Sequence, residues 1–391
     1  MLFKPNKKPV LILIVLISFV LGLWIGKKQT ECRIYPPGNF DFSLFWETYE
    51  VLQEKFVDKA KFDNQEMLYG AIAGMVKSLG DPYTVFLDPE KTKRFVEDVR
   101  GTYEGVGMEI GIRKGQLQVI APLEGTPAQK AGLRAGDKIL EIDGNPTTDI
   151  TIDEAVELIR GPKGTEVALT ILRKEWDLPK EFKVKRAVIE IPSLKWELKE
   201  GEIAYIQLYQ FTEKASSDFK KAALEILNSP AKKIILDVRN NPGGYLRVVQ
   251  DIAGWFLERG KMVAIEDFGK NKKKNYYKSQ GPASFLDYPL VVLINEGSAS
   301  GSEILAGALR DNRGVLLIGE KTFGKGSVQE LEKLSGGSSL KVTVAHWLTP
   351  KGDLITERGL EPDIKVEISE EDFEAGRDPQ LEKAIEILKN L

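Results

Sequence analysis

From Ile189 onward the chain alternates between short apolar runs rich in β-branched residues and longer segments with helical spacing. Strands are predicted at 203–211, 232–238, 291–296 and 314–320, and helices at 213–227, 248–257 and 304–309. Strands that alternate with helices in this way are typical of a mainly parallel sheet with helices packed on it. The pattern therefore predicts a layered α/β core in the second half of the chain.

Three serines, Ser298, Ser300 and Ser302, fall where one of these strands turns into its helix. The first amides of a helix are unpaired and the helix dipole favours negative charge, so an oxyanion would be stabilised at this turn. Ser300 followed three residues later by Glu303 is also a capping box, which alone accounts for a serine here. On this stretch by itself, capping is the favoured interpretation and catalysis is the alternative.

A glycine-rich segment, Gly319 to Glu330, follows the last predicted strand. It matches a phosphate-binding loop up to the position where serine or threonine must bind magnesium, which is Gly326 here, so an ATPase is disfavoured. Lys325 is a candidate general base, because a desolvated lysine can be neutral at working pH; a solvated loop charge is the alternative. His346, the single histidine, is a weaker candidate, since no orienting acid is apparent.

The sharp turn at Arg239 to Leu246 carries Gly243 and Gly244, whose amides become oxyanion-hole candidates if a nucleophile lies beside them.

Composition removes several other classes of function. Over 391 residues the net charge is -3, which gives no electrostatic case for nucleic-acid binding. One cysteine excludes an internal disulfide, and one histidine excludes an ordinary zinc site. Neither a metal nor a cofactor is expected.

The N-terminal 28 residues combine a basic start with an apolar run at 10–25. The run is short for a membrane span and long for a signal-peptide core, and no small-residue cleavage site follows it. We expect an uncleaved signal-anchor in the inner membrane, with the catalytic part in the periplasm, and a linker at 29–40.

Helical spacing at 42–57, 65–79 and 89–99 predicts a small helical bundle over 41–99. The turn-rich connection GDPYTVFLDP lies inside it, and no chemical role is expected for this bundle.

Residues 100–187 show short alternating strands and glycine turns, with helices expected at 127–131 and 152–159. This segment resembles a PDZ domain of the bacterial protease type. The run Gly105-Val106-Gly107-Met108 stands where such domains place their carboxylate-binding loop, and GLRAGD at 132–137 is the usual turn into the next strand. Loop amides would bind a C-terminal carboxylate while the tail adds to the strand 108–112, which includes Ile110. Arg160 is a candidate contact for that carboxylate or for a neighbouring domain, or else a solvated charge.

Four motifs together, GDPYTVFL, the PDZ segment, LDVRNNPGG and GSASGSEI followed by GKGSVQ, resemble the carboxy-terminal processing peptidases, a family of tail-specific serine endopeptidases. The resemblance implies a crotonase/ClpP-like α/β protease core over 188–370, with an inserted PDZ domain and a small helical N-terminal domain. It implies Ser300 as the nucleophile, Lys325 as the base and Gln329 as the residue that orients the lysine.

The same resemblance assigns the oxyanion hole to the amide of Gly301 together with Gly243 or Gly244, and gives Asp311 a supporting role. Many members have alanine where this chain has Gly301. The amide is retained, although a glycine there is more mobile.

We therefore expect a membrane-anchored serine endopeptidase that recognises apolar C-terminal tails of envelope proteins through its PDZ domain and cuts with a Ser–Lys pair. An inactive PDZ scaffold that recruits envelope proteins is the alternative. Protein substrates and the membrane are the expected partners, a second copy of the chain and an adaptor protein stay open, and nucleic acid is not expected. The C-terminal helix at 371–391 is predicted to pack on the helical N-terminal region or on a second subunit.

Overall fold

The computed structural model describes residues 41–391 apart from 114, 124, 174, 271, 370, 373 and 374. The predicted signal-anchor at 1–28 and linker at 29–40 lie outside the described residues. Among the helices that are described, none is long and apolar enough to span a bilayer. The chain divides into two compact units, with the division between Leu68 and Tyr69.

The three helices predicted near the N-terminus are present. They are α2 Ser43–Lys55, α3 Asn64–Lys77 and α4 Pro89–Arg100, with a short 3-10 turn, η1 Lys59–Lys61, after α2. Neither α2 nor α4 buries a residue, and α3 buries only Val76. Along α2 the aromatic rings from Phe42 to Tyr49 contact one another edge to face. These rings follow one another along the outside of a single helix, so Trp46 stays 57% exposed.

The β-rich segment predicted after α4 is confirmed. Its strands are β2 Thr102–Gly105, β3 Met108–Arg113, β4 Gln116–Pro122, β5 Lys138–Ile142, β6 Asn145–Pro146, β7 Glu166–Leu172, β8 Lys180–Lys185 and β9 Ala187–Glu190. The main sheet has the order β3-β4-β5-β7-β8, so β3 is an edge strand, and β2 pairs separately with β9. The helices α5 Pro127–Lys130 and α6 Ile152–Ile159 lie where the sequence predicts them, and α6 starts at a Thr151–Glu154 capping box.

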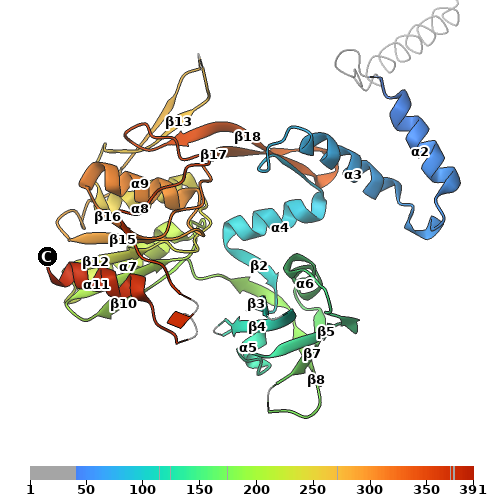
Figure 1. The fold of residues 1–391 in the computed structure, drawn as a ribbon, viewed down its shortest axis with the longest axis horizontal. Helices are drawn as coiled ribbons and strands as arrows, with labels where there is room; N and C mark the ends of the chain where they lie inside the picture. The colour runs from blue at the N-terminus through green and yellow to red at the C-terminus, as the bar shows by residue number, and fades with distance from the viewer. Residues whose placement is uncertain are drawn as a thin grey trace, which may run out of the picture. The chain divides into compact units, whose positions relative to one another are not determined.

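The α/β core is a six-stranded sheet in the order β10-β11-β12-β15-β16-β19, parallel except for β10 (Figure 1). Its strands are β10 Leu194–Lys199, β11 Ile203–Leu208, β12 Lys233–Asp237, β15 Leu290–Ile294, β16 Leu316–Gly319 and β19 Ile364–Lys365. One face is covered by α7 Ala215–Leu227, α8 Leu246–Phe256 and α9 Gly301–Arg313, whose apolar side chains form the largest buried cluster. The central strands are buried on both faces, which explains their continuous apolar runs.

The C-terminal helix α11, Pro379–Lys389, covers the other face of this sheet (Figure 1). Ala384 and Leu388 are fully buried among strand residues that include Ile235 and Leu293. The prediction placed this helix on the N-terminal helical region or on a second subunit, whereas the structure packs its apolar face on the core sheet. A parallel sheet exposes apolar side chains on both faces, and α11 is the element that covers the second one.

Arg239 connects α11 to the turn that follows β12. Its guanidinium donates to Asp237 Oδ2 over 2.7 Å, to Asp378 Oδ1 and Oδ2 over 2.9 and 2.8 Å, and to Gln380 Oε1 over 2.9 Å. The Arg239 and Asp237 side chains are 11% and 1% exposed. The C-terminal helix is thus held by Arg239, a largely buried cation whose carboxylate partner on the helix, Asp378, is 34% exposed.

We expect Arg239→Met to destabilise the protein by about 3–5 kcal/mol, because it leaves buried Asp237 without a cationic partner. Urea unfolding measures this change. Arg377→Met is the matched control, since Arg377 pairs with Asp372 while 48% exposed, and a cost below about 1 kcal/mol is expected there. Equal losses in the two variants would contradict the structural role given to Arg239.

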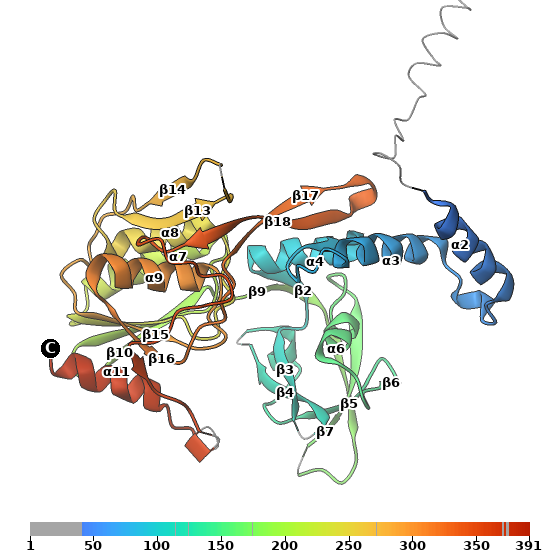
Figure 2. The ribbon, with the colours of Figure 1, turned by 45° about the horizontal axis from the view of Figure 1, so that its top comes forward.

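A second sheet has the order β1-β18-β13-β14, with β17 also paired to β18. Its strands are β1 Val85–Leu87, β13 Met262–Asp267, β14 Asn275–Lys278, β17 Ser327–Lys333 and β18 Ser339–Leu348, with the turn η2 Ser335–Gly337 between the last two. The β17–β18 hairpin extends away from the core helices (Figure 2). Strand β1 comes from GDPYTVFL, which was predicted to be a turn-rich connection.

Candidate active site

Ser300 lies at the start of α9, where the chain turns after β15. Its φ of 52° is in the left-handed region that residues other than glycine rarely adopt. The neighbouring hydroxyls of Ser298 and Ser302 are fully buried and donate to the carbonyls of Val238 and Asn241, each over 2.8 Å. Ser300 is only half-buried. Of the three serines, Ser300 is therefore the one placed to meet a substrate.

Glu303 accepts hydrogen bonds from both the nucleophile turn and the lysine loop. Its Oε2 accepts from the backbone amides of Ser300 over 2.8 Å and Lys325 over 3.0 Å. Its Oε1 accepts from Thr322 Oγ1 over 2.6 Å and from the Gly324 amide over 2.7 Å. The side chain is fully buried, and this burial raises the pKa of Glu303 although the hydrogen bonds favour the carboxylate. Glu303, which was predicted as part of a helix cap, thus also joins the Ser300 turn to the Lys325 loop.

Lys325 is half-buried, and burial lowers its pKa while the Glu303 carboxylate raises it. Its Nζ lies 5.7 Å from the centroid of the Tyr83 ring. Among the described carboxylates, none forms an ion pair with this amine. A lysine with a lowered pKa and no paired carboxylate is suited to accept a proton.

The glycines beside Lys325 allow its backbone to approach another loop. A Cβ on Gly326 would lie 2.2 Å from the Thr356 amide nitrogen, so only glycine fits. Strand β17 follows at Ser327, whereas a phosphate-binding loop leads into a helix. The structure therefore agrees with rejecting the ATPase interpretation.

Gln329 lies on β17, and its Nε2 donates to the backbone oxygen of Tyr83 over 2.6 Å. The carbonyl of Tyr83 can only accept, so the amide nitrogen must face it. The Gln329 Oε1 is then the atom left to accept a hydrogen bond from an amine.

The Gly243 turn packs directly against Ser300. A Cβ on Gly243 would lie 2.7 Å from the Ser300 Cβ and 2.8 Å from the Gly301 nitrogen. The Gly243 amide already donates to Asn241 Oδ1 over 2.9 Å. Within the described chain the amides of Gly244 and Gly301 make no hydrogen bond, so these two are free to donate to a ligand.

Two further sequence candidates are hydrogen-bonded to other groups. Asp311 is near the end of α9, about 16 Å along the helix axis from Ser300, and accepts from the Lys351 amide over 3.0 Å. His346 is exposed on β18, and its Nδ1 shares a hydrogen bond of 2.9 Å with Thr356 Oγ1. The geometry gives Asp311 a structural role rather than contact with the nucleophile.

The predicted carboxylate-binding loop leads into the edge strand β3. Gly105 ends β2, Val106 is buried in the core of the β-rich segment, and Met108 and Ile110 are partly buried beside that core. The Gly107 carbonyl accepts from Thr126 Oγ1 over 2.8 Å. An unpaired strand edge next to a glycine loop is the arrangement that β-augmentation requires.

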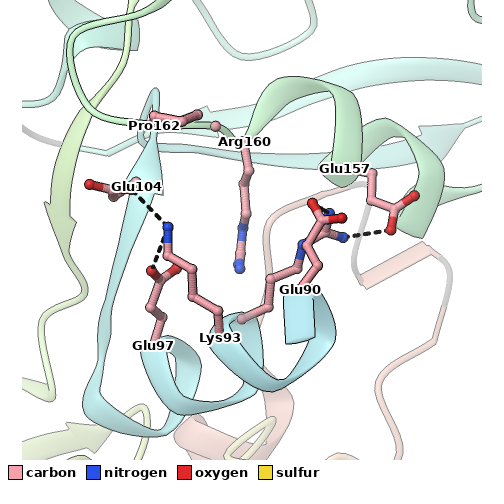
Figure 3. Close-up of a pocket in the computed structure, with 9 residues that line it drawn as sticks. Glu90, Lys93, Glu97, Glu104, Glu157, Arg160 and Pro162 are labelled. Carbon is pink, nitrogen blue, oxygen red and sulfur yellow. Dashed lines mark hydrogen bonds and ion pairs between the residues drawn. The ribbon is translucent and has the colours of Figure 1, made fainter. Parts of the chain in front are cut away.

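Arg160 points into a cavity of about 160 Å³ between α4 and the end of α6 (Figure 3). It donates to Asp98 of α4 over 2.9 Å and lies 4.4 Å above the Tyr103 ring. Ion pairs line the same cavity, joining Arg94 to Glu90 and Glu157, and Lys93 to Glu97 and Glu104. Arg160 therefore contacts the neighbouring helix α4 in this structure. A contact with a neighbouring part of the chain was one of the alternatives predicted for it.

Comparison with known proteins agrees with this architecture. The models of peptidase family S41, a PDZ domain and the activating protease CtpB N-terminal domain match residues 202–366, 118–173 and 28–91. Over 344 residues the chain is 35% identical to carboxy-terminal processing protease CtpA of Bacillus subtilis, covering 88% of this chain and 72% of that protein. The chain belongs to the carboxy-terminal processing serine proteases.

Other members are similarly related to this protease. It is 38% identical over 327 residues to a carboxy-terminal-processing protease of Bartonella bacilliformis, covering 83% of this chain and 74% of the relative. Among solved structures, the photosystem II D1 C-terminal processing protease matches with a TM-score of 0.53 and 29% identity, covering 83% of this chain and 86% of that one. The protein is thus a serine peptidase with a mixed α/β fold and a PDZ domain.

The sequence interpretation of this protease missed two residues near its reactive groups. Glu303 was seen only as a helix cap, although it also binds the lysine loop. Tyr83 was not considered, although it contacts Gln329 and Lys325. The signal for Tyr83 was the GDPYTVFL motif itself, which lay far from the other motifs in sequence and received no role.

Proposed function

We propose that this protease hydrolyses peptide bonds with Ser300 as nucleophile and neutral Lys325 as general base, oriented by Gln329. The observation that carries the proposal is the buried Glu303 carboxylate, which binds the Ser300 and Lys325 amides over 2.8 and 3.0 Å. One side chain thereby fixes the spacing of the two reacting segments. The parallel sheet with helices on both faces supports a core of the crotonase/ClpP type.

In the proposed mechanism, Lys325 Nζ accepts the hydroxyl proton of Ser300 as Oγ attacks the substrate carbonyl carbon. The resulting oxyanion accepts hydrogen bonds from Gly301 and Gly244, because the Gly243 amide is already bonded to Asn241. The protonated lysine then gives its proton to the leaving amine, which breaks the C–N bond. Water, deprotonated by Lys325, hydrolyses the acyl-enzyme and returns Ser300 to its starting state.

The PDZ segment supplies the proposed substrate selection. A C-terminal tail would add to β3, with its carboxylate at the loop Gly105–Met108 and apolar side chains beside Met108 and Ile110. Envelope proteins with apolar tails are the proposed substrates. The basic and apolar sequence at 1–28 supports anchoring in the inner membrane with the catalytic part in the periplasm, which fractionation of the full chain tests. Exposed aromatic rings on α2 support binding of a second copy or an adaptor protein.

The substrate proposal predicts cleavage that depends on the tail. One loosely folded protein ending in Leu-Ala-Ala and the same protein ending in Asp-Asp are compared, with a chelator present. We expect kcat/KM to be about 10- to 100-fold higher for the apolar tail, the effect of about 1.4–2.8 kcal/mol of tail binding.

Ile110→Asp should reduce this preference to near unity, because a charge on β3 opposes binding of an apolar tail. Lys183→Asp, an exposed substitution on β8, is the matched control and should keep the preference. Equal cleavage of both tails by the parent would contradict the PDZ role. Absence of cleavage of either tail would contradict the peptidase mechanism.

A further inference from the structure

The segment Gly80–Leu87 lies beside the proposed general base, although no chemical role was predicted for it. Its last three residues form β1, which pairs antiparallel with β18 and places Val85 opposite Lys341. Strand β17, which carries Gln329, pairs with the same part of β18 through Leu331 and Lys341. The segment is therefore part of the sheet that holds the orienting glutamine.

Hydrogen bonds fix the turn before β1. Asp81 Oδ1 accepts from the Tyr83 amide over 3.0 Å, and Oδ2 accepts from Thr84 Oγ1 over 2.6 Å. Thr84 is 5% exposed, and its Oγ1 in turn accepts from the Thr343 amide of β18 over 3.1 Å. The backbone of Tyr83 is thus set on β18 independently of its own side chain.

Tyr83 contacts both members of the proposed base pair. Its carbonyl oxygen accepts from Gln329 Nε2 over 2.6 Å, and its ring centroid lies 5.7 Å from Lys325 Nζ. The first contact decides which way the Gln329 amide faces. The second places an aromatic ring beside the amine.

We propose that Tyr83 is a positioning residue for the Lys325–Gln329 pair, its carbonyl fixing the glutamine amide and its ring shielding the lysine amine from water. The inference rests on the proposed Ser–Lys mechanism. It assigns the GDPYTVFL motif to the catalytic site, so that the protease core depends on a segment that precedes the PDZ domain.

The charged groups around Lys325 come from separate elements. Glu303 of α9 raises the pKa of Lys325, whereas burial and the Lys325 charge lower the pKa of Lys341 on β18. Burial raises the pKa of the Tyr83 hydroxyl, and so do the nearby carboxylates Glu303, Asp81 and Glu357. Tyr83 therefore stays neutral at working pH, and its effect on Lys325 comes from its ring.

The ring has two opposite effects on the lysine. Its face attracts the ammonium form, which is worth about one pKa unit at most at this separation. Shielding from water disfavours the ammonium form and can reach about three pKa units or more for a buried lysine. Burial is the leading cause of the lowered Lys325 pKa. Removing the ring should therefore raise that pKa.

The test compares Tyr83→Ala with Tyr83→Phe, which keeps the ring. Tyr69→Ala is the matched control, because Tyr69 contacts Phe86 of β1 at a ring separation of 5.7 Å. Two quantities are measured: the apparent pKa of kcat/KM, and the pKa of Lys325 from the pH dependence of its acylation, read by mass spectrometry. The second measurement needs only folded protein. Unfolding curves show which variants are folded, and Tyr83→Leu replaces Tyr83→Ala if the latter is not.

For Tyr83→Ala we expect both pKa values to rise by about one unit and kcat at neutral pH to fall about 10-fold, with KM nearly unchanged. Tyr83→Phe should stay within about threefold of the parent, and Tyr69→Ala should leave both pKa values unchanged. An unchanged Lys325 pKa in Tyr83→Ala, or an equal shift in Tyr69→Ala, would overturn the role of Tyr83. Parent hydrolysis that survives Lys325→Met would instead overturn the Ser–Lys mechanism.

Discussion

Lys325→Met should lower kcat/KM by about 10⁴-fold, and Ser300→Ala should lower it at least as much. Without the amine, the Ser300 hydroxyl has no partner to accept its proton, and without the hydroxyl no acyl-enzyme forms. The double variant should be no worse than either single one, because the two residues act as a unit. Initial rates of cleavage of the protein with an apolar tail, at saturating and subsaturating concentrations, measure these losses.

Lys321→Met is the matched control, since Lys321 lies in the same loop but is exposed and pairs with Glu361. Its activity should stay within about twofold of the parent. Hydrolysis that survives Lys325→Met would show that another group removes the serine proton. The activity of His346→Ala would then show whether the single histidine is that group.

The same pair of residues predicts a pH dependence. Activity needs neutral Lys325, so kcat/KM should rise with pH through a pKa below the ordinary lysine value of 10.5, because burial disfavours the ammonium. The native state then binds fewer protons than the unfolded chain between the lowered pKa and 10.5. The lysine therefore costs stability at neutral pH, and that cost disappears above 10.5. Lys325→Met should be more stable than the parent near pH 7, with an advantage that vanishes at high pH.

The α/β core could be predicted because each of its strands and helices carries its own signal. The runs at Ile234 and Val291 are apolar and β-branched on both faces, which is typical of a buried parallel strand. The PDZ helices at 127–131 and 152–159 were predicted within a segment of short alternating strands and glycine turns. Ser300 and Lys325 were identified from motifs, and the structure shows that their backbones are linked, since Glu303 accepts from the amides of both.

The missed features depend on contacts between distant parts of the chain. β1 has three residues and no alternation of its own, and it forms because β18 offers an edge more than 250 positions later. The periodicity of α11 shows an apolar face but not the sheet that it covers. Periodicity predicts a helix, whereas the partner of its apolar face must come from the fold.

Glu303→Gln should lower kcat/KM by about 10²- to 10³-fold while the fold is retained. Glu303 accepts four hydrogen bonds, two on each carboxylate oxygen. A glutamine has one oxygen, so its amide nitrogen would face two donors. If the nitrogen faces the Ser300 and Lys325 amides, both reacting segments lose their shared acceptor. Each lost bond costs about 1–3 kcal/mol, and the two segments are no longer held at a fixed spacing.

The pH profile of kcat/KM distinguishes the positioning role of Glu303 from an effect of its charge on the protonation of Lys325. Glu303 raises the pKa of Lys325, so removing the charge alone should lower that pKa and increase the neutral fraction. A purely electrostatic role would therefore leave activity at low pH equal to or above that of the parent. Glu296→Gln is the control, because Glu296 is exposed in the turn just before the serines. A large loss of kcat at every pH, together with a lower apparent pKa, would show that Glu303 acts by fixing the distance between nucleophile and base.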